Sequence, residues 1–181
     1  MEAVTIQRTV EEVTLESTIN LVHEFAKTSV ILKKLNKVIN SSLKNKVSNM
    51  DYDYSKLYKD DEAAKQMMNQ ESLRQLISAL HDRLYKAIKK LSPDDKTTLY
   101  GIVSSHVTEY ESRLTTITEV IEVSCDQLRE TDKSETELRE EIIGRINSYS
   151  SVKEELKYHA ETYLALKHYI GGLTNASRFK K

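Results

Sequence analysis

The scarcity of glycine and proline is the strongest constraint on the fold of this chain. The 181 residues include four glycines and one proline, which is far below ordinary usage. Sandwiches, barrels and βαβ folds need many tight turns, and those turns depend on these two residue types. The composition therefore predicts a few long elements joined by few turns. At this length, a single domain can bury a core without disulfides or a metal.

Apolar side chains recur every three or four residues through four segments, which is the period of an amphipathic helix. The segments cover about residues 5–47, 62–91, 93–130 and 135–170. From Leu73 to Leu91 the apolar spacing alternates between four and three residues, which is the heptad pattern of a coiled coil. The sequence predicts an all-α protein, an elongated up-down antiparallel bundle of four long helices with coiled-coil-like packing.

Capping signals mark two of the predicted helix starts. Ser92 can cap a helix in which Pro93 occupies the first position, because proline fits there without losing a hydrogen bond. Ser134 and Glu137 have the spacing of a capping box. The short connections next to both signals predict that neighbouring helices run antiparallel.

The loop and helix-stop signals predict a single domain. Residues 48–61 interrupt the periodicity and predict a loop, and Gly171 and Gly172 predict a helix stop. We therefore expect one helical domain over residues 1–172 and a mobile tail over 173–181. Gly101 and Gly144 lie inside predicted helices, which favours close packing or a mild bend there, with a hinge as the alternative.

Charge and targeting signals narrow the setting. The net charge is −1, which gives no strong overall attraction to nucleic acid or an anionic membrane. Cys125 is the one cysteine, so no internal disulfide can form, which suits a reducing compartment. The N-terminal residues lack the pattern of a secretory signal, and no stretch approaches the ~18 apolar residues of a membrane span. These features lead us to expect a cytoplasmic protein.

A lysine-rich stretch in the first helix is one candidate site. In an up-down bundle, this stretch would share a pole with the acidic residues of 109–141, which favours neutralisation within the chain. The alternative is that its basic face binds an anionic surface, with a membrane or an acidic protein partner preferred over nucleic acid. The candidate residues are Lys27, Lys33, Lys34, Lys37 and Lys44.

Three histidines form a second candidate site. His106 and His159 lie at stripe positions equally far from the turn at 131–134, so an antiparallel hairpin places them in one layer. His81 is predicted to lie within one helical turn of that layer, and Glu109 follows His106. These side chains could hold zinc or another transition ion, or respond to pH. The alternative is a buried, hydrogen-bonded histidine pair that sets the register of the helices.

Catalytic motifs are absent from the sequence. It contains no glycine-rich phosphate loop and none of the nucleophile or zinc-protease motifs, so we expect no enzyme activity and no cofactor. The leading hypothesis is a non-enzymatic interaction protein, such as a scaffold, tether or assembly subunit. Such a protein would act through helix packing with a protein partner or through self-association into an oligomer.

Overall fold

The protein is described by a computed structural model covering residues 13–47 and 61–178, with side chains over 13–41 and 65–174. Helices α1 (Leu15–Val47), α2 (Asp61–Lys90), α3 (Pro93–Glu130) and α4 (Thr136–Arg178) account for nearly all of these residues. The predicted all-α fold with four long helices is therefore confirmed for the described part of the chain. Residues 48–60 of the predicted loop 48–61 and the final residues 179–181 lie outside it, whereas Asp61 is already helical.

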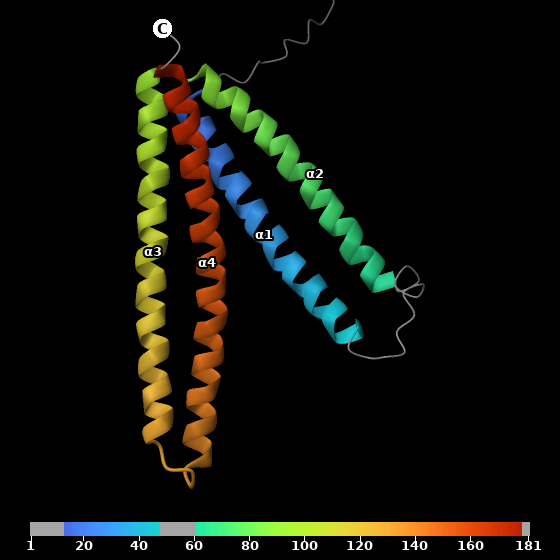
Figure 1. Ribbon diagram of the computed structural model, residues 1–181, viewed down its shortest axis with the longest axis vertical. Coiled ribbons are helices and arrows are strands. Elements are labelled where there is room, and N and C mark those ends of the chain that lie inside the picture. The colour runs from blue at the N-terminus through green and yellow to red at the C-terminus, as the bar shows by residue number, and fades with distance from the viewer. Residues whose placement is uncertain (1–12, 48–60, 179–181) are drawn as a thin grey trace, which may run out of the picture.

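The four helices form two antiparallel hairpins that meet at one end of the molecule and diverge toward the other (Figure 1). Helix α3 packs most extensively on α4, and α1 on α2, while α1 also packs along α4. We call the shared end the junction and the diverging parts the α1–α2 arm and the α3–α4 arm. Residues near the chain's middle turn, at 91–92, lie at the junction, and the α3–α4 turn lies at the tip of its arm.

The hydrophobic core is concentrated at the junction, where all four helices contribute side chains. Val22 of α1, Leu84 of α2, Leu99 of α3 and Ile170 of α4 are each at most 1% exposed. They belong to one cluster of buried apolar residues that also contains Ala26, Ile88, Leu91, Val103, Val107, Tyr163 and Leu166. Burial of this apolar surface is the main stabilising contribution that joins the two hairpins.

The residues that α4 presents to α1 explain why the hairpins separate. Lys33 and Lys37 of α1 reach Thr162 and Glu154 of α4. The helical period extends this α4 face toward the arm tip through Ser151, Asn147, Gly144 and Glu140. These residues offer no apolar surface to bury, so continuing the α1–α4 contact would gain little. Packing between the hairpins therefore stops where the apolar side chains stop.

The predicted start of α3 is confirmed. Ser92 has an extended backbone, its side chain accepts a hydrogen bond from the Asp95 backbone N–H at 3.1 Å, and Pro93 is the first helical residue. This arrangement satisfies one of the N–H groups left free at a helix start. The two-residue connection joins α2 and α3 at the junction, but the two helices diverge from it and do not pack along their length, so the antiparallel packing predicted for this pair is not formed.

The predicted capping box of α4 is wrong by one residue. Helix α4 begins at Thr136, so Glu135 and not Ser134 precedes it. Instead, the Asp132 carboxylate accepts a hydrogen bond from the Ser134 backbone N–H at 3.1 Å. Arg139 closes the turn by donating to the carbonyl oxygens of Leu128 and Thr131, both at 3.0 Å. The guanidinium thereby satisfies carbonyls at the end of α3.

Helix α1 starts at Leu15, so residues 13 and 14 of the predicted helix are not helical. Residues 5–12 of the predicted helix lie outside the described part. Thr14 and Ser17 cap the helix reciprocally, since each side-chain oxygen accepts the other residue's backbone N–H. This cap marks the start of α1, because the two hydroxyl oxygens accept hydrogen bonds from backbone N–H groups that lack a carbonyl partner at a helix N-terminus.

The predicted helix stop at Gly171 and Gly172 is also wrong. Helix α4 continues to Arg178, so residues 173–178 of the predicted tail are helical, and no described glycine has a positive φ. A Cβ on Gly171 would lie 3.1 Å from the Tyr100 ring, whereas one on Gly172 would meet nothing within 4 Å. Gly171 therefore admits an aromatic side chain from α3 and does not terminate the helix.

Candidate functional site

A cluster of histidine and tyrosine rings lies where the junction gives way to the arms. His23 of α1 packs edge-on against His106 of α3, with ring centroids 4.9 Å apart. His106 stacks on Tyr163 of α4 at 5.2 Å, Tyr163 on Tyr110 at 5.4 Å, and Tyr110 on His159 at 5.1 Å. We call these five residues the His–Tyr cluster. It joins α1 to both helices of the other hairpin through one continuous series of rings.

The environment of the cluster favours uncharged rings. Burial, with the neighbouring His106, lowers the pKa of His23. Burial also lowers the pKa of His159, although the nearby Glu155 carboxylate opposes that shift. Burial raises the pKa of Tyr163 to about 12. Each shift has the sign expected when water is removed from the charged form of a side chain.

A hydrogen bond links His23 to Tyr163. The Tyr163 hydroxyl lies 2.7 Å from Nδ1 of His23. Since Tyr163 keeps its proton at neutral pH, its hydroxyl can donate to an unprotonated Nδ1. The same hydroxyl could accept from an Nδ1–H, so the contact is compatible with either direction of donation. The neutral state of His23 is favoured because its ring is partly buried and a positive charge would lie beside the His106 ring.

The predicted metal-site residues do not converge. His106 Nδ1 lies 3.9 Å from the Glu109 carboxylate, but stacked tyrosines separate His106 from His159. His81 lies elsewhere, against Tyr169 and Phe25, at centroid distances of 5.1 and 6.3 Å. Over the described residues, no group of three or more histidine, cysteine, aspartate or glutamate side chains could hold a metal ion.

Sequence reasoning placed His106 and His159 in one layer, whereas the rings of Tyr163 and Tyr110 lie between them, and it missed His23. His81 projects to the α1–α2–α4 side because α2 packs mainly on α1 and scarcely on α3. His23 occupies the place next to His106 that the prediction gave to His81. The available signal was its position three residues before the buried Ala26, which puts His23 on a buried face of α1.

Three of the five lysines in the predicted anionic-surface site contact α4. Lys34 lies 2.8 Å from the Glu155 carboxylate, and Lys37 pairs with Glu154. Lys33 donates to the Thr162 hydroxyl at 3.0 Å and lies 4.0 Å from Glu161. The pKa values of Glu154 and Glu155 are both lowered, and the largest cause is the hydrogen bond from Lys37 to Glu154 and from Lys34 to Glu155.

Neutralisation within the chain therefore involves acids of α4 that differ from those expected. The prediction paired the lysines with the acidic residues of 109–141, but the far end of α1 lies away from the tip of the α3–α4 arm (Figure 1). The separation of the two hairpins prevents that contact. Lys27 is exposed on the same helix, and the side chain of Lys44 lies outside the described residues.

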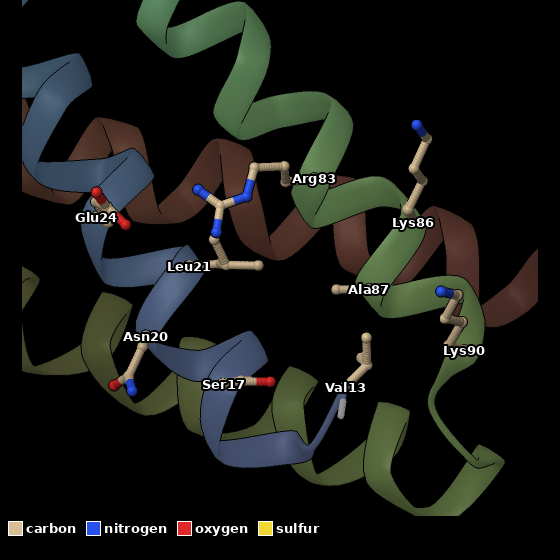
Figure 2. Close-up of a pocket in the computed structure, with 9 residues that line it drawn as sticks. All are labelled: Val13, Ser17, Asn20, Leu21, Glu24, Arg83, Lys86, Ala87 and Lys90. Atoms are coloured by element: carbon tan, nitrogen blue, oxygen red, sulfur yellow. The ribbon is translucent and has the colours of Figure 1, made fainter. Parts of the chain in front are cut away.

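A polar groove runs between α1 and α2 at the junction (Figure 2). Its volume is about 350 Å³, and its walls include Ser17 and Glu24 of α1 and Arg83, Lys86 and Lys90 of α2. Val13, Leu21 and Ala87 supply a small apolar floor. Three cations and one carboxylate make the groove positive overall.

Comparisons with protein-family models, curated proteins and solved structures give no match to this chain. Over the part of the chain described by the structure, no helix has the length and apolar character needed to cross a membrane. The geometry of the helices and their side chains is thus the basis for a functional proposal.

Proposed function

We propose that the protein is a non-enzymatic helical interaction protein whose arms pack against helices of a second copy or of a partner. The observation that supports this is the contrast in burial along the α3–α4 arm. Beyond the junction, each helix has only one long neighbour. Ile142 is buried there, but several other apolar residues of the arm remain exposed or half-buried instead of entering a core.

Specific side chains illustrate the incomplete burial. On the α3–α4 arm, Val123 is 57% exposed and Val152 is 46% exposed. On the α1–α2 arm, Ile31 and Val38 are 44% and 51% exposed, and their seven-residue spacing puts them on one face of α1. Single exposed apolar residues are ordinary, but a heptad-spaced pair on the exposed face of a helix is what a partner helix would cover.

Sedimentation equilibrium of the full chain over a wide concentration range tests this proposal. We expect concentration-dependent association that Val152→Glu weakens at least tenfold, because a charge would then have to be buried at the contact. Ser151→Glu is the matched control, since it adds the same charge one residue away on an exposed, polar side of α4. A chain that stays monomeric throughout, or equal effects of both variants, would contradict self-association through this arm.

A second candidate function is a response to pH at the His–Tyr cluster. It is favoured by the 4.9 Å contact between His23 and His106, because two imidazolium rings at that distance would repel. The groups facing His23 are His106 of α3 and Tyr163 of α4, and Glu109 lies beside His106. Acidification would then weaken the attachment of α1 to the α3–α4 hairpin.

Circular dichroism and fluorescence transfer between labelled arms, measured between pH 7.5 and 5, test this second candidate. We expect arm separation to change with little loss of helix content. His23→Gln should reduce the pH response. His168→Gln, a control at an exposed histidine of α4, should leave the response unchanged. An arm separation that is constant over this range would contradict the second candidate.

Binding of an anionic surface by the lysines of α1 remains the third candidate. Its support is reduced because Lys33, Lys34 and Lys37 face carboxylates or a hydroxyl of α4. A phosphate surface would compete with these contacts. Co-sedimentation with anionic vesicles at two salt concentrations tests it, and binding unchanged by Lys34→Glu and Lys37→Glu would contradict it.

A further inference from the structure

The cations of the α1–α2 groove differ from those of α1 in having no acidic partner within the described residues. Arg83, Lys86 and Lys90 are wall residues of the groove. Among the described residues, no carboxylate forms an ion pair with any of the three. By contrast, Lys34 and Lys37 of α1 are paired with α4 carboxylates. Within residues 13–41 and 65–174, three neighbouring cations at this groove are therefore without a paired carboxylate.

Helical geometry concentrates these three charges. The spacing of Arg83, Lys86 and Lys90 is three and then four residues, which places them within ~60° of the helix circumference at ~100° per residue. Seven residues of helix span about 10 Å. In Figure 2, Arg83 reaches over Leu21 toward α1, whereas Lys86 points outward from α2. The three side chains thus belong to one face of α2, with the Lys86 head group at the outer edge of the groove.

We propose that this groove binds a small anion carrying two phosphoryl groups, such as a pyrophosphate or a bisphosphorylated head group. A phosphoryl group carries about −1.5 to −2 charges at neutral pH, so two of them match three cations, whereas one carboxylate would leave two cations unmatched. Arginine suits this role because its planar fork can donate two hydrogen bonds to a phosphate. The volume of about 350 Å³ accommodates a ligand of that size.

Glu24 sets the orientation of the ligand. It is the only carboxylate among the residues that line the groove, and it lies at the end toward which Arg83 reaches. The ligand's charge is therefore located toward Lys86 and Lys90, with the Arg83 guanidinium between it and Glu24. This arrangement predicts that neutralising Glu24 raises the affinity for the ligand. A nonspecific attraction to the net charge of the protein would raise the affinity only weakly.

Titration calorimetry of the full chain with pyrophosphate at low ionic strength tests the proposal. We expect saturable one-site binding that Lys86→Glu combined with Lys90→Glu weakens at least tenfold and that Glu24→Gln tightens about twofold or more. Lys89→Glu is the matched control, because Lys89 packs over the Tyr85 ring, 4.8 Å from its centroid, and does not line the groove. Unchanged helix content by circular dichroism verifies that each variant is folded.

The source of the phosphoryl groups is tested with two further probes. Vesicles containing a bisphosphorylated inositol lipid would co-sediment with the protein if the source is a membrane, whereas binding of soluble pyrophosphate alone would identify a free ligand. No binding of pyrophosphate or of these vesicles by the unmodified chain would overturn the proposal. Equal weakening by Lys89→Glu, or equal affinity for a short oligoglutamate peptide of matched charge, would overturn it as well.

Discussion

The junction and the α3–α4 arm are built from the same helices, yet they bury apolar side chains to very different extents. Val103 and Val123 both belong to α3, but Val103 is 1% exposed at the junction and Val123 is 57% exposed on the arm. Val103 belongs to the apolar cluster that all four helices form, whereas Val123 lies ~200° farther round α3 at ~100° per residue. The neighbouring Ser124 is 6% exposed on the same arm, so burial here depends on whether a position faces another helix more than on the residue type.

This contrast assigns different roles to the two regions. The junction holds the buried core and the His–Tyr cluster, so it determines stability and the angle between the hairpins. The arms contribute length and exposed apolar faces at modest cost in stability. A protein that joins partners through helices needs both features, a rigid base and faces left free for contact.

Replacing Val103 and Val123 by alanine should give the largest difference in stability between the junction and the arm. Val103→Ala should destabilise the fold by about 2 kcal/mol, because it leaves a cavity in a closely packed core. Val123→Ala should change stability by less than about 0.5 kcal/mol, and alanine's higher helix propensity could make it slightly stabilising. Urea unfolding of both variants measures the difference. Equal losses would show that the arm is packed as tightly as the junction.

Glycine substitutions test packing between α3 and α4 at the two ends. A Cβ at Gly101 or Gly144 meets nothing within 4 Å, which excludes the predicted close packing there. Gly101→Ala and Gly144→Ala should therefore each stabilise the protein by about 1 kcal/mol through helix propensity alone.

Gly171→Ala is the contrasting substitution at the junction. Its Cβ would come within 3.1 Å of the Tyr100 ring, so the gain in helix propensity should be cancelled by displacement of that ring. Gly172→Ala, which meets nothing within 4 Å, is the adjacent control. Thermal unfolding compares them, and a gain at Gly171 equal to that at Gly172 would show that Tyr100 moves away without cost.

Acidification should weaken the junction selectively. The pKa values of His23 and His159 are lowered in the fold, so the unfolded chain binds more protons as the pH falls below about 6.5. The free energy of unfolding should therefore decrease from pH 7 toward pH 5. We expect a change below about 1 kcal/mol per ring, because both rings are partly exposed and water screens their interactions.

Urea unfolding at several pH values measures this dependence. His23→Gln should flatten it, whereas His168→Gln, at an exposed position, should leave it unchanged. A stability that rises on acidification, or an equal response in both variants, would show that the His–Tyr cluster does not control the pH dependence.

The ion pairs between α1 and α4 should have the smallest effect. Lys34 and Glu155 are 45% and 50% exposed, and exposed pairs of this kind contribute about 0.2–1 kcal/mol, less at high salt. A double-mutant cycle with Lys34→Met and Glu155→Gln should give a coupling energy below about 0.5 kcal/mol. A larger coupling that resists salt would mean that charge, and not core packing, holds α1 on α4.

The sequence by itself determined the four helices, because apolar periodicity and the Ser92–Pro93 cap are local signals. It also put His106 and His159 on the facing sides of α3 and α4, since a short turn fixes the register of two antiparallel helices, although two tyrosine rings lie between them. Apolar periodicity could not predict that Gly171 and Gly172 continue a helix. That outcome depends on the Tyr100 ring of another helix filling the space beside Gly171.

Only the tertiary structure decided how the two hairpins sit against each other. The angle between them brings His23 to His106, sends His81 toward Tyr169, and pairs the α1 lysines with Glu154 and Glu155. Local periodicity specifies which face of a helix is apolar, but it does not specify how far along the helix a neighbour follows it. That length is set by the balance of packing between all four helices, which no single segment encodes.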